Sequence, residues 1–231
     1  MTNLSDANWV QVDSATRRVL LVPVGSLEQH GPHLPLDTDT RIAVAVAQGV
    51  ASAREDVWVA PAIAFGASGE HAGFAGTLSI GTPALTELLV ELGRDASRDW
   101  DAVLLVNAHG GNRDAVDEAL ARLHAEGRRV AVFQVSPPGG DAHAGRSETA
   151  LLMYLQPQAV RHDAAAVGET RPVSALMDRL RAEGVRAVTP NGVLGDPRGA
   201  TASEGERLLA MLTAGCTAAL EALLVTESAR A

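Results

Sequence analysis

Residues 18–53 read "RVLLVPVGSLEQHGPHLPLDTDTRIAVAVAQGVASA". Residues 18–25 form a continuous apolar run, which is typical of a strand buried on both faces. Residues 39–53 show the apolar pattern of a helix. The connection between them concentrates carboxylates and imidazoles and includes two prolines, Pro32 and Pro35. The segment therefore predicts a strand, a rigid polar loop and a helix in succession.

The same alternation of apolar runs and amphipathic patterns continues along the chain. Further strands are expected at 57–66, 77–81, 102–107 and 129–135, and further helices at 83–99, 112–127, 147–155, 173–184 and 203–226. Strands separated by helices favour parallel pairing with helices on both faces. We predict α/β architecture: a single doubly wound domain over residues 1–231, with a mostly parallel sheet flanked by helices.

Composition limits the class of function. The chain has 231 residues and a formal net charge of −9, which argues against nucleic acid or an anionic membrane as partner. One cysteine, Cys216, excludes a disulfide within the chain and a zinc site built mainly of thiolates. The stretch "MTNLSDANWVQVD" has neither the basic nor the apolar region of a signal peptide, so a soluble, cytoplasmic protein is expected.

Polar side chains follow three of the expected strands. They are Glu28 and His30 after the first strand, His109 after the strand at 102–107, and His143 and Glu148 after the strand at 129–135. In open α/β sheets, ligands bind beyond the carboxyl ends of the strands. These side chains, distant in sequence, are therefore expected to converge on one edge of the sheet.

Several residues of these loops also have an ordinary structural explanation. Asp39 can cap the next helix, His30 and His33 can form hydrogen bonds within the loop, and Asp37 can be a turn residue. A carboxylate at Glu148 is favourable in the first turn of a helix for electrostatic reasons alone.

Taken together, the residues suggest a metal centre. The candidate ligands are Glu28, His30, Asp39, His109 and Glu148. Three carboxylates and one bridging hydroxide neutralise two divalent cations, whereas a single divalent ion would be over-neutralised. We therefore predict two divalent metal ions per chain with Asp39 bridging. Nitrogen and oxygen ligands suit zinc, manganese or ferrous iron.

Such a centre favours hydrolysis of an amide C–N bond. Divalent ions lower the pKa of bound water and polarise a carbonyl. His143 has no ligand role in this scheme, so it is the candidate catalytic residue that passes a proton to the leaving amine. The loop "GEHAGFAG" at 69–76 adds Glu70 and His71, which either line the pocket or form a turn before the strand at 77–81.

Four motifs resemble those of the creatininase family of metal-dependent amidohydrolases. They are "GSLEQHGPHLPLDTDT", "GEHAGFAGTLSIG", "NAHGGN" and "HAGRSET". The resemblance implies a doubly wound α/β domain with a dinuclear centre. It also implies Glu28, His30, Asp39 and His109 as ligands, with Asp39 bridging, and assembly as homo-oligomers, often hexamers.

The chain departs from creatininase itself in two places. In creatininase, the residue two positions after the ligand histidine is acidic and binds metal. The corresponding residue after His109 in this chain is Gly111, so that ligand role is assigned to Glu148. The loop "FQVSPPGGDAHAG" has none of the tryptophans that close over creatinine, which argues against creatinine as substrate.

Within the family, the chain is most similar to a member that removes a C-terminal dipeptide from a modified precursor peptide. His71 and Arg146 are the candidate substrate-binding residues, with Arg146 a partner for a terminal carboxylate or a surface residue. Hydrolysis of a small lactam or formamide is the alternative. A metal-binding module without catalytic turnover is a second class of hypothesis, but it would give His143 no role.

Overall fold

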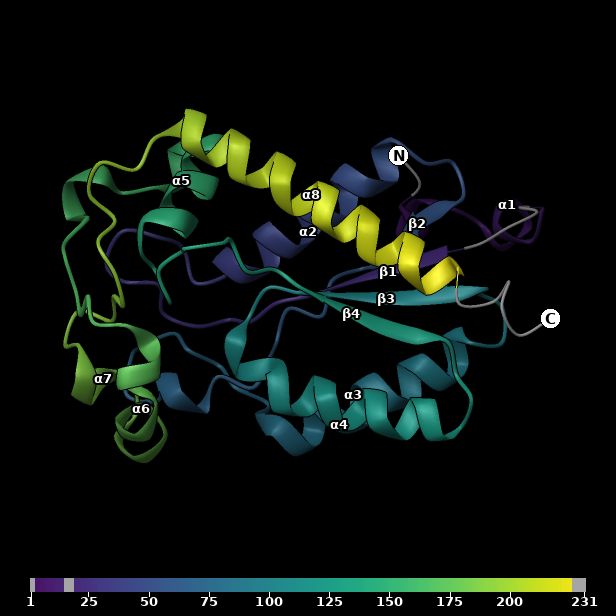
Figure 1. Ribbon diagram of the computed structural model, residues 1–231, viewed down its shortest axis with the longest axis horizontal. Coiled ribbons are helices and arrows are strands. Elements are labelled where there is room, and N and C mark those ends of the chain that lie inside the picture. Colours follow the sequence, from purple (N-terminus) through teal and green to yellow (C-terminus); the bar gives the residue numbers. More distant parts are fainter. Residues whose placement is uncertain (1–2, 15–18, 226–231) are drawn as a thin grey trace.

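The computed structural model describes residues 3–14 and 19–225, and a parallel sheet lies at its centre (Figure 1). Its four strands run in the order β2-β1-β3-β4, and every neighbouring pair is parallel. The strands are β1 (Val19–Val24), β2 (Val57–Val59), β3 (Ala102–Asn107) and β4 (Val130–Gln134). The predicted fold class, a parallel sheet flanked by helices, is confirmed.

Helices cover both faces of the sheet (Figure 1). One face carries α2 (Thr38–Ser52), α5 (Arg146–Leu155) and α8 (Ala202–Val225). The other face carries α3 (Gly81–Ala96) and α4 (Arg113–Ala125). The shorter helices are α1 (Trp9–Asp13), α6 (Met177–Glu183) and α7 (Val185–Val188). Short 3₁₀ turns lie at Leu4–Asp6, Gly69–His71, Gly110–Asn112, Pro157–Ala159, His162–Ala164 and Val173–Ala175.

Burial of the central strand explains its continuous apolar sequence. Val19 and Leu21 of β1 pack into the core beneath α2, α5 and α8. Leu20 and Val22 point the other way, into the core beneath α3 and α4. Because successive side chains of a strand alternate between faces, a strand covered on both faces needs apolar residues at every position.

Helix α8 is long and apolar enough by composition to cross a membrane, and it alone passes that test among the described residues. Leu212, Cys216 and Leu220 of α8 are nevertheless buried in the core of the sheet's first face. A helix that covers a soluble core has the same length and composition, so this feature is weak evidence for a membrane.

Of the predicted strands, the one at 57–66 is shorter than expected and the one at 77–81 is absent. Only Val57–Val59 of the expected strand at 57–66 pairs as a strand. Pro61 has no N–H to donate, and beyond it the chain touches β1 through one bridge, between Ile63 and Val24. Residues 77–81, all within the described part of the chain, form no strand. Leu78 instead makes a single antiparallel bridge to Leu27, in the loop after β1.

Other boundaries are close to those expected. Gly127 follows α4 with a φ of 72°, as expected of the residue that closes a helix. The helix expected at 173–184 is divided into the 3₁₀ turn Val173–Ala175 and α6. Arg18 and Thr226, at the ends of two expected elements, lie outside the described residues.

Asn112 occupies the position before α4, where a side chain can cap a helix. Its side chain makes no capping hydrogen bond to α4. The Asn112 amide instead donates to the carbonyl oxygen of Gly25 at 2.9 Å and accepts from the Ala67 N–H at 2.8 Å. It therefore ties the loop after β1 to the loop after β2, beside the polar cluster described next.

Candidate metal centre

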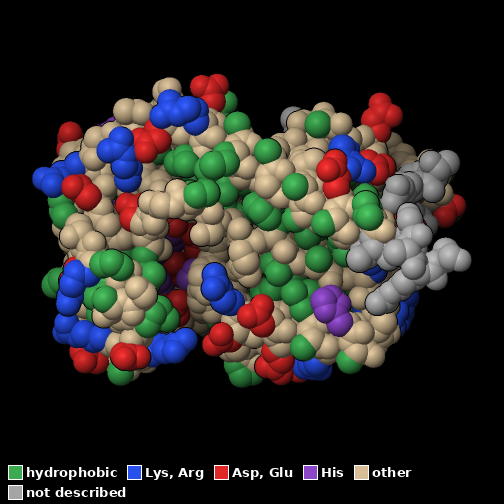
Figure 2. Space-filling model, in the orientation of Figure 1, with side chains coloured by type: hydrophobic (Ala, Val, Ile, Leu, Met, Phe, Trp, Pro, Cys, Tyr) green, Lys and Arg blue, Asp and Glu red, His purple; other side chains and the backbone are tan. Residues whose placement is uncertain are grey.

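The polar side chains predicted to converge do converge. Glu28 and His30 lie in the loop after β1, and Asp39 lies in the first turn of α2. His109 follows β3, and His143 lies between β4 and α5. These five residues are between 0% and 7% exposed. Figure 2 shows a hollow in one face of the molecule with acidic and histidine side chains inside it.

Asp39 lies between two imidazoles. Its Oδ1 is 3.1 Å from His30 Nε2, and its Oδ2 is 3.2 Å from His109 Nδ1. Ser26 Oγ donates to Oδ2 at 2.7 Å, which fixes the plane of the carboxylate. A carboxylate that faces two nitrogen donors through separate oxygens has the arrangement expected of a bridging ligand.

Glu28 provides the test of whether these residues fit a metal. It is fully buried, and neither carboxylate oxygen has a hydrogen-bond partner among the described residues. Its oxygens nevertheless lie 3.1 Å from His109 Nε2, 3.3 Å from His71 Nε2 and 3.6 Å from His143 Nδ1. Leaving a buried carboxylate unsatisfied is costly, and a cation would satisfy it. The donor set therefore fits a divalent ion.

His30 is oriented by the main chain. Its Nδ1 lies 3.1 Å from the carbonyl oxygen of Glu28, which can only accept, so Nδ1 carries the hydrogen. Nε2 then faces Asp39 and, at 3.9 Å, Glu148 Oε2, and it is the nitrogen that a metal ion would bind in place of a hydrogen. A histidine ligand whose second nitrogen donates to a carbonyl is the usual arrangement at protein metal sites.

Glu148 is held in place by a strained residue. The N–H of Ala144 donates to Glu148 Oε2 at 2.6 Å. Ala144 has a φ of 51°, and it is the one positive-φ residue other than glycine among the residues described. That conformation is costly for a residue with a Cβ, and such residues occur at functional sites.

The cluster's electrostatics show that its carboxylates attract positive charge. Burial alone would lower the pKa of His30, but Asp39, Glu148 and Glu28 together outweigh it and raise that pKa to about 10. Burial opposes ionisation of Asp39, yet His30 and His109 hold its pKa well below the ordinary value. Burial raises the pKa of Glu148 to about 7. Burial, helped by His30, keeps the pKa of His143 well below its ordinary value.

Three overlapping groups have ligand atoms close enough to hold an ion. They are Glu28, Asp39 and His109; His30, His143 and Glu148; and Glu28, His71 and His143. The cluster therefore offers more than one set of ligand atoms for a metal ion.

The remaining candidates lie around this cluster or outside it. His71 joins the cluster, as the contact with Glu28 shows. Arg146 is half exposed and pairs with Glu204 at 2.8 Å, so the structure does not bring it into the cluster. His33 contacts Thr149 Oγ1 at 2.9 Å, and Asp37 accepts from Arg41 at 2.7 Å.

Two participants were missed from the sequence alone. Ser26 orients Asp39, and Gln29 contacts two histidines of the cluster. Both lie within the motif at 25–40, so proximity to the candidate ligands was the available signal.

Gly111 occupies a crowded position beside His109. A Cβ at this residue would overlap His109 Nε2, the carbonyl oxygen of Ala67 and Glu70 Oε1. Glu70 Oε1 lies 3.5 Å from His109 Nε2. Gly111 therefore leaves a space that the Glu70 carboxylate partly fills.

The parallel sheet, the helices on its two faces and the buried cluster of histidines and carboxylates together define an α/β protein with a candidate metal centre. The family model described as creatinine amidohydrolase (creatininase) matches residues 5–220. The chain belongs to the creatininase family and is an amidohydrolase, which acts on amide bonds.

Relatives and solved structures agree with this assignment. The mycofactocin precursor peptide peptidase of Mycolicibacterium smegmatis is 54% identical over 203 residues, covering 86% of this chain and 82% of the relative. The Mycobacterium tuberculosis protein of the same name is 49% identical over 222 residues, covering 92% and 88%. A structure titled "Creatininase Mn" has a TM-score of 0.80 at 26% identity, covering 95% of this chain and 97% of the other.

Proposed function

We propose that this protein is a metal-dependent peptidase that removes a C-terminal dipeptide from the mycofactocin precursor peptide. The observation that carries the chemistry is the buried Glu28 carboxylate, whose unpaired oxygens face three imidazoles. The choice of substrate is supported by the 54% and 49% identity to peptidases of that name.

The proposed centre holds two divalent ions in a single domain. Glu28, Asp39 and His109 would hold one ion. Asp39, His30 and Glu148 would hold the other, with Asp39 shared between the two. Zinc, manganese and ferrous iron suit these ligands. Two solved neighbours support the first two metals, one titled "Creatininase Mn" and the other a mutant creatininase of "Zn-Zn type". When bound, the ions would supply Lewis acidity to the scissile amide.

His143 is the proposed proton carrier. Its Nε2 lies 2.8 Å from the carbonyl oxygen of Gln29, so Nε2 donates there and Nδ1 presents its lone pair to the cluster. Nδ1 can therefore take up a proton beside Glu28 and deliver it to the leaving amine. Burial lowers the pKa of His143, which favours the neutral form that this role requires.

Arg146 is the proposed partner for the terminal carboxylate of the peptide. It lies at the start of α5, two residues before Glu148. Its guanidinium pairs with Glu204 in the first turn of α8, so substrate binding would require it to exchange that partner. A guanidinium can hold a carboxylate through two parallel hydrogen bonds.

Hydrolysis of a small amide is the second candidate. Creatinine amidohydrolase of Pseudomonas putida is 28% identical over 237 residues. The two candidates are separated by offering precursor-type peptides with a free C-terminal carboxylate beside the same peptides amidated, with creatinine and a formamide as controls. Cleavage of creatinine or the formamide, with both peptides intact by mass spectrometry, would refute the peptidase proposal.

Assembly as a cytoplasmic homo-oligomer, such as a hexamer, is also proposed. The outer side of α8 supports it, because the apolar side chains of Met211 and Val225 are 42% and 68% exposed there. A monomer by light scattering at micromolar concentration would contradict this part of the proposal.

A further inference from the structure

Helix α5 carries Glu148 in its first turn, but the residue before the helix cannot cap it. That residue is Gly145, which has no side chain to accept from the first N–H groups. Asp141 accepts instead, its Oδ2 from the main-chain N–H of Arg146 and its Oδ1 from that of Ser147 at 3.0 Å. One carboxylate therefore satisfies two of the four N–H groups that a helix leaves free at its start.

A second carboxylate closes the same turn in the opposite direction. Asp141 reaches forward to the N–H groups of the helix, whereas Glu148 Oε2 reaches back to the Ala144 N–H at 2.6 Å. A capping box exchanges hydrogen bonds in the same two directions. The turn 141–148 is thus closed by its own two carboxylates, and the positive φ of Ala144 is held between them.

Two glycines leave the space that the Asp141 carboxylate occupies. A Cβ at Gly145 or at Gly195 would overlap that carboxylate. Gly145 has an extended backbone with a φ of −96°, so at this position glycine provides space and not a left-handed conformation. Asp141 therefore lies in a notch between the start of α5 and the loop that contains Gly195.

The loop that contains Gly195 is held against the turn by main-chain hydrogen bonds. The Leu194 N–H donates to the carbonyl oxygen of His143 at 2.9 Å, and the Leu194 carbonyl oxygen accepts from the His143 N–H at 3.3 Å. On the other side, the Gly168 N–H donates to the carbonyl oxygen of Gly195 at 3.1 Å. Both walls of the notch are thus fixed by the fold.

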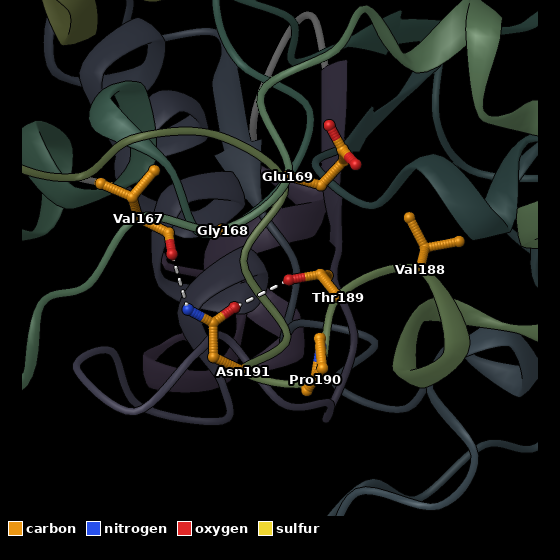
Figure 3. Close-up of a pocket in the computed structure, with 7 residues that line it drawn as sticks. All are labelled: Val167, Gly168, Glu169, Val188, Thr189, Pro190 and Asn191. Carbon is orange, nitrogen blue, oxygen red and sulfur yellow. Dashed lines mark hydrogen bonds between the residues drawn. The ribbon is translucent and has the colours of Figure 1, made fainter.

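Asn191 anchors the same loop from further along the chain. Its side-chain nitrogen donates to Val167 O at 3.0 Å, and its side-chain oxygen accepts from Thr189 Oγ1 at 2.8 Å (Figure 3). None of these three residues belongs to the metal centre. The position of Gly195, and with it the notch for Asp141, therefore follows from contacts outside that centre.

We propose that Asp141 is a positioning residue that holds Glu148 and His143 at the metal centre. Its carboxylate fixes the first turn of α5, which leaves Glu148 Oε2 at 3.9 Å from His30 Nε2. The same turn carries His143, two residues after Asp141. The roles of Glu148 and His143 rest on the proposed function, but the turn and its hydrogen bonds do not.

The loss of this carboxylate should affect one metal ion and not the other. The two N–H groups would lose their acceptor, so the first turn of α5 should fray. Glu148 would then withdraw from the ion that it shares with His30, and the affinity for that ion should fall about 10–100-fold, the usual loss when the support of a ligand is removed. The ion held by Glu28, Asp39 and His109 has no ligand on this turn. A general loss of stability would weaken both ions.

The test is zinc titration against a competing chelator, beside amide hydrogen exchange followed by nitrogen-15 NMR in the zinc-loaded protein. In Asp141→Ala, exchange at the Arg146 and Ser147 N–H groups should become faster, and the affinity for one zinc ion alone should fall. Asp141→Asn keeps one acceptor oxygen and should lose less. Asp196→Asn is the matched control, because it removes the same charge from the neighbouring loop, where Asp196 accepts from the Arg198 N–H at 3.0 Å. It should leave both zinc affinities unchanged.

A second substitution keeps the test decisive if Asp141→Ala does not fold. In Gly145→Ala the new Cβ would displace the Asp141 carboxylate without removing it, so the same zinc ion should be weakened. Combined with Asp141→Asn, its effect should be less than additive, because both substitutions act on one contact. Unchanged zinc affinities in these variants, or equal losses at both ions, overturn the proposal. A precursor peptide that the wild type does not cleave refutes the proposed function but leaves the zinc and exchange results valid.

Discussion

Replacing Asp39 by asparagine tests the shared ligand. The asparagine has the same shape, so the change removes one negative charge and one oxygen. Ser26 Oγ–H donates to Oδ2, so the amide should keep its oxygen on that side, toward His109. Its NH₂ group then replaces Oδ1, which faces His30 Nε2 at 3.1 Å. An amide nitrogen is not a metal ligand, so the ion beside His30 should be lost first.

The size of the effect follows from the position of the residue. Loss of a group that only orients a ligand costs about 10–100-fold in metal affinity. Replacing a carboxylate that touches both ions should lower metal affinity on the His30 side by more than about 100-fold. At 1.4 kcal/mol per tenfold, this is more than about 2.8 kcal/mol of binding free energy. At the His109 side the oxygen remains but the charge does not, so affinity should fall less.

The assay is metal analysis by plasma mass spectrometry after dialysis, followed by zinc titration against a competing chelator. We expect about two ions per chain in the wild type and one or fewer in Asp39→Asn. Asp37→Asn is the matched control, because Asp37 pairs with Arg41 and is not part of the cluster. Two ions bound to Asp39→Asn with unchanged affinity would refute the bridging role.

Three further predictions concern other residues. The His143→Ala variant should keep its metal but turn over about 10²–10⁴-fold more slowly, as measured by peptide cleavage beside metal analysis. Loss of an ion from this variant would instead make His143 a ligand. Gly111→Ala should lower the free energy of unfolding by about 1–3 kcal/mol and weaken metal binding, because the new Cβ would shift His109. Gly110→Ala is the control and should do neither, because a Cβ there meets nothing within 4 Å. Equal effects of the two substitutions in denaturant titrations would contradict this prediction. Burial raises the pKa of the Cys216 thiol to about 12, so the thiolate fraction at pH 8 is about 10⁻⁴. A disulfide reagent should therefore react with Cys216 only after the protein is unfolded in guanidinium. Fast reaction of the native protein would contradict this prediction.

Local patterns in the sequence were enough to predict the sheet and most of the cluster. The apolar run of β1 needs burial on both faces, and such strands pair in parallel beneath helices. Glu28, His109 and His143 each follow a strand, and the carboxyl ends of parallel strands meet at one edge. These inferences require only the order of elements along the chain, which local hydrophobic periodicity reveals.

Only the tertiary structure shows how the loops meet above that edge. The sequence suggested a strand at 77–81, but this segment packs against the loop after β1 and brings Thr77 to the Gln29 N–H. The unpaired oxygens of Glu28 and the Gln29 contact with His71 depend on distances between loops from different strands. Periodicity within one segment carries no information on such distances, because the packing of one loop on another determines which atoms face each other.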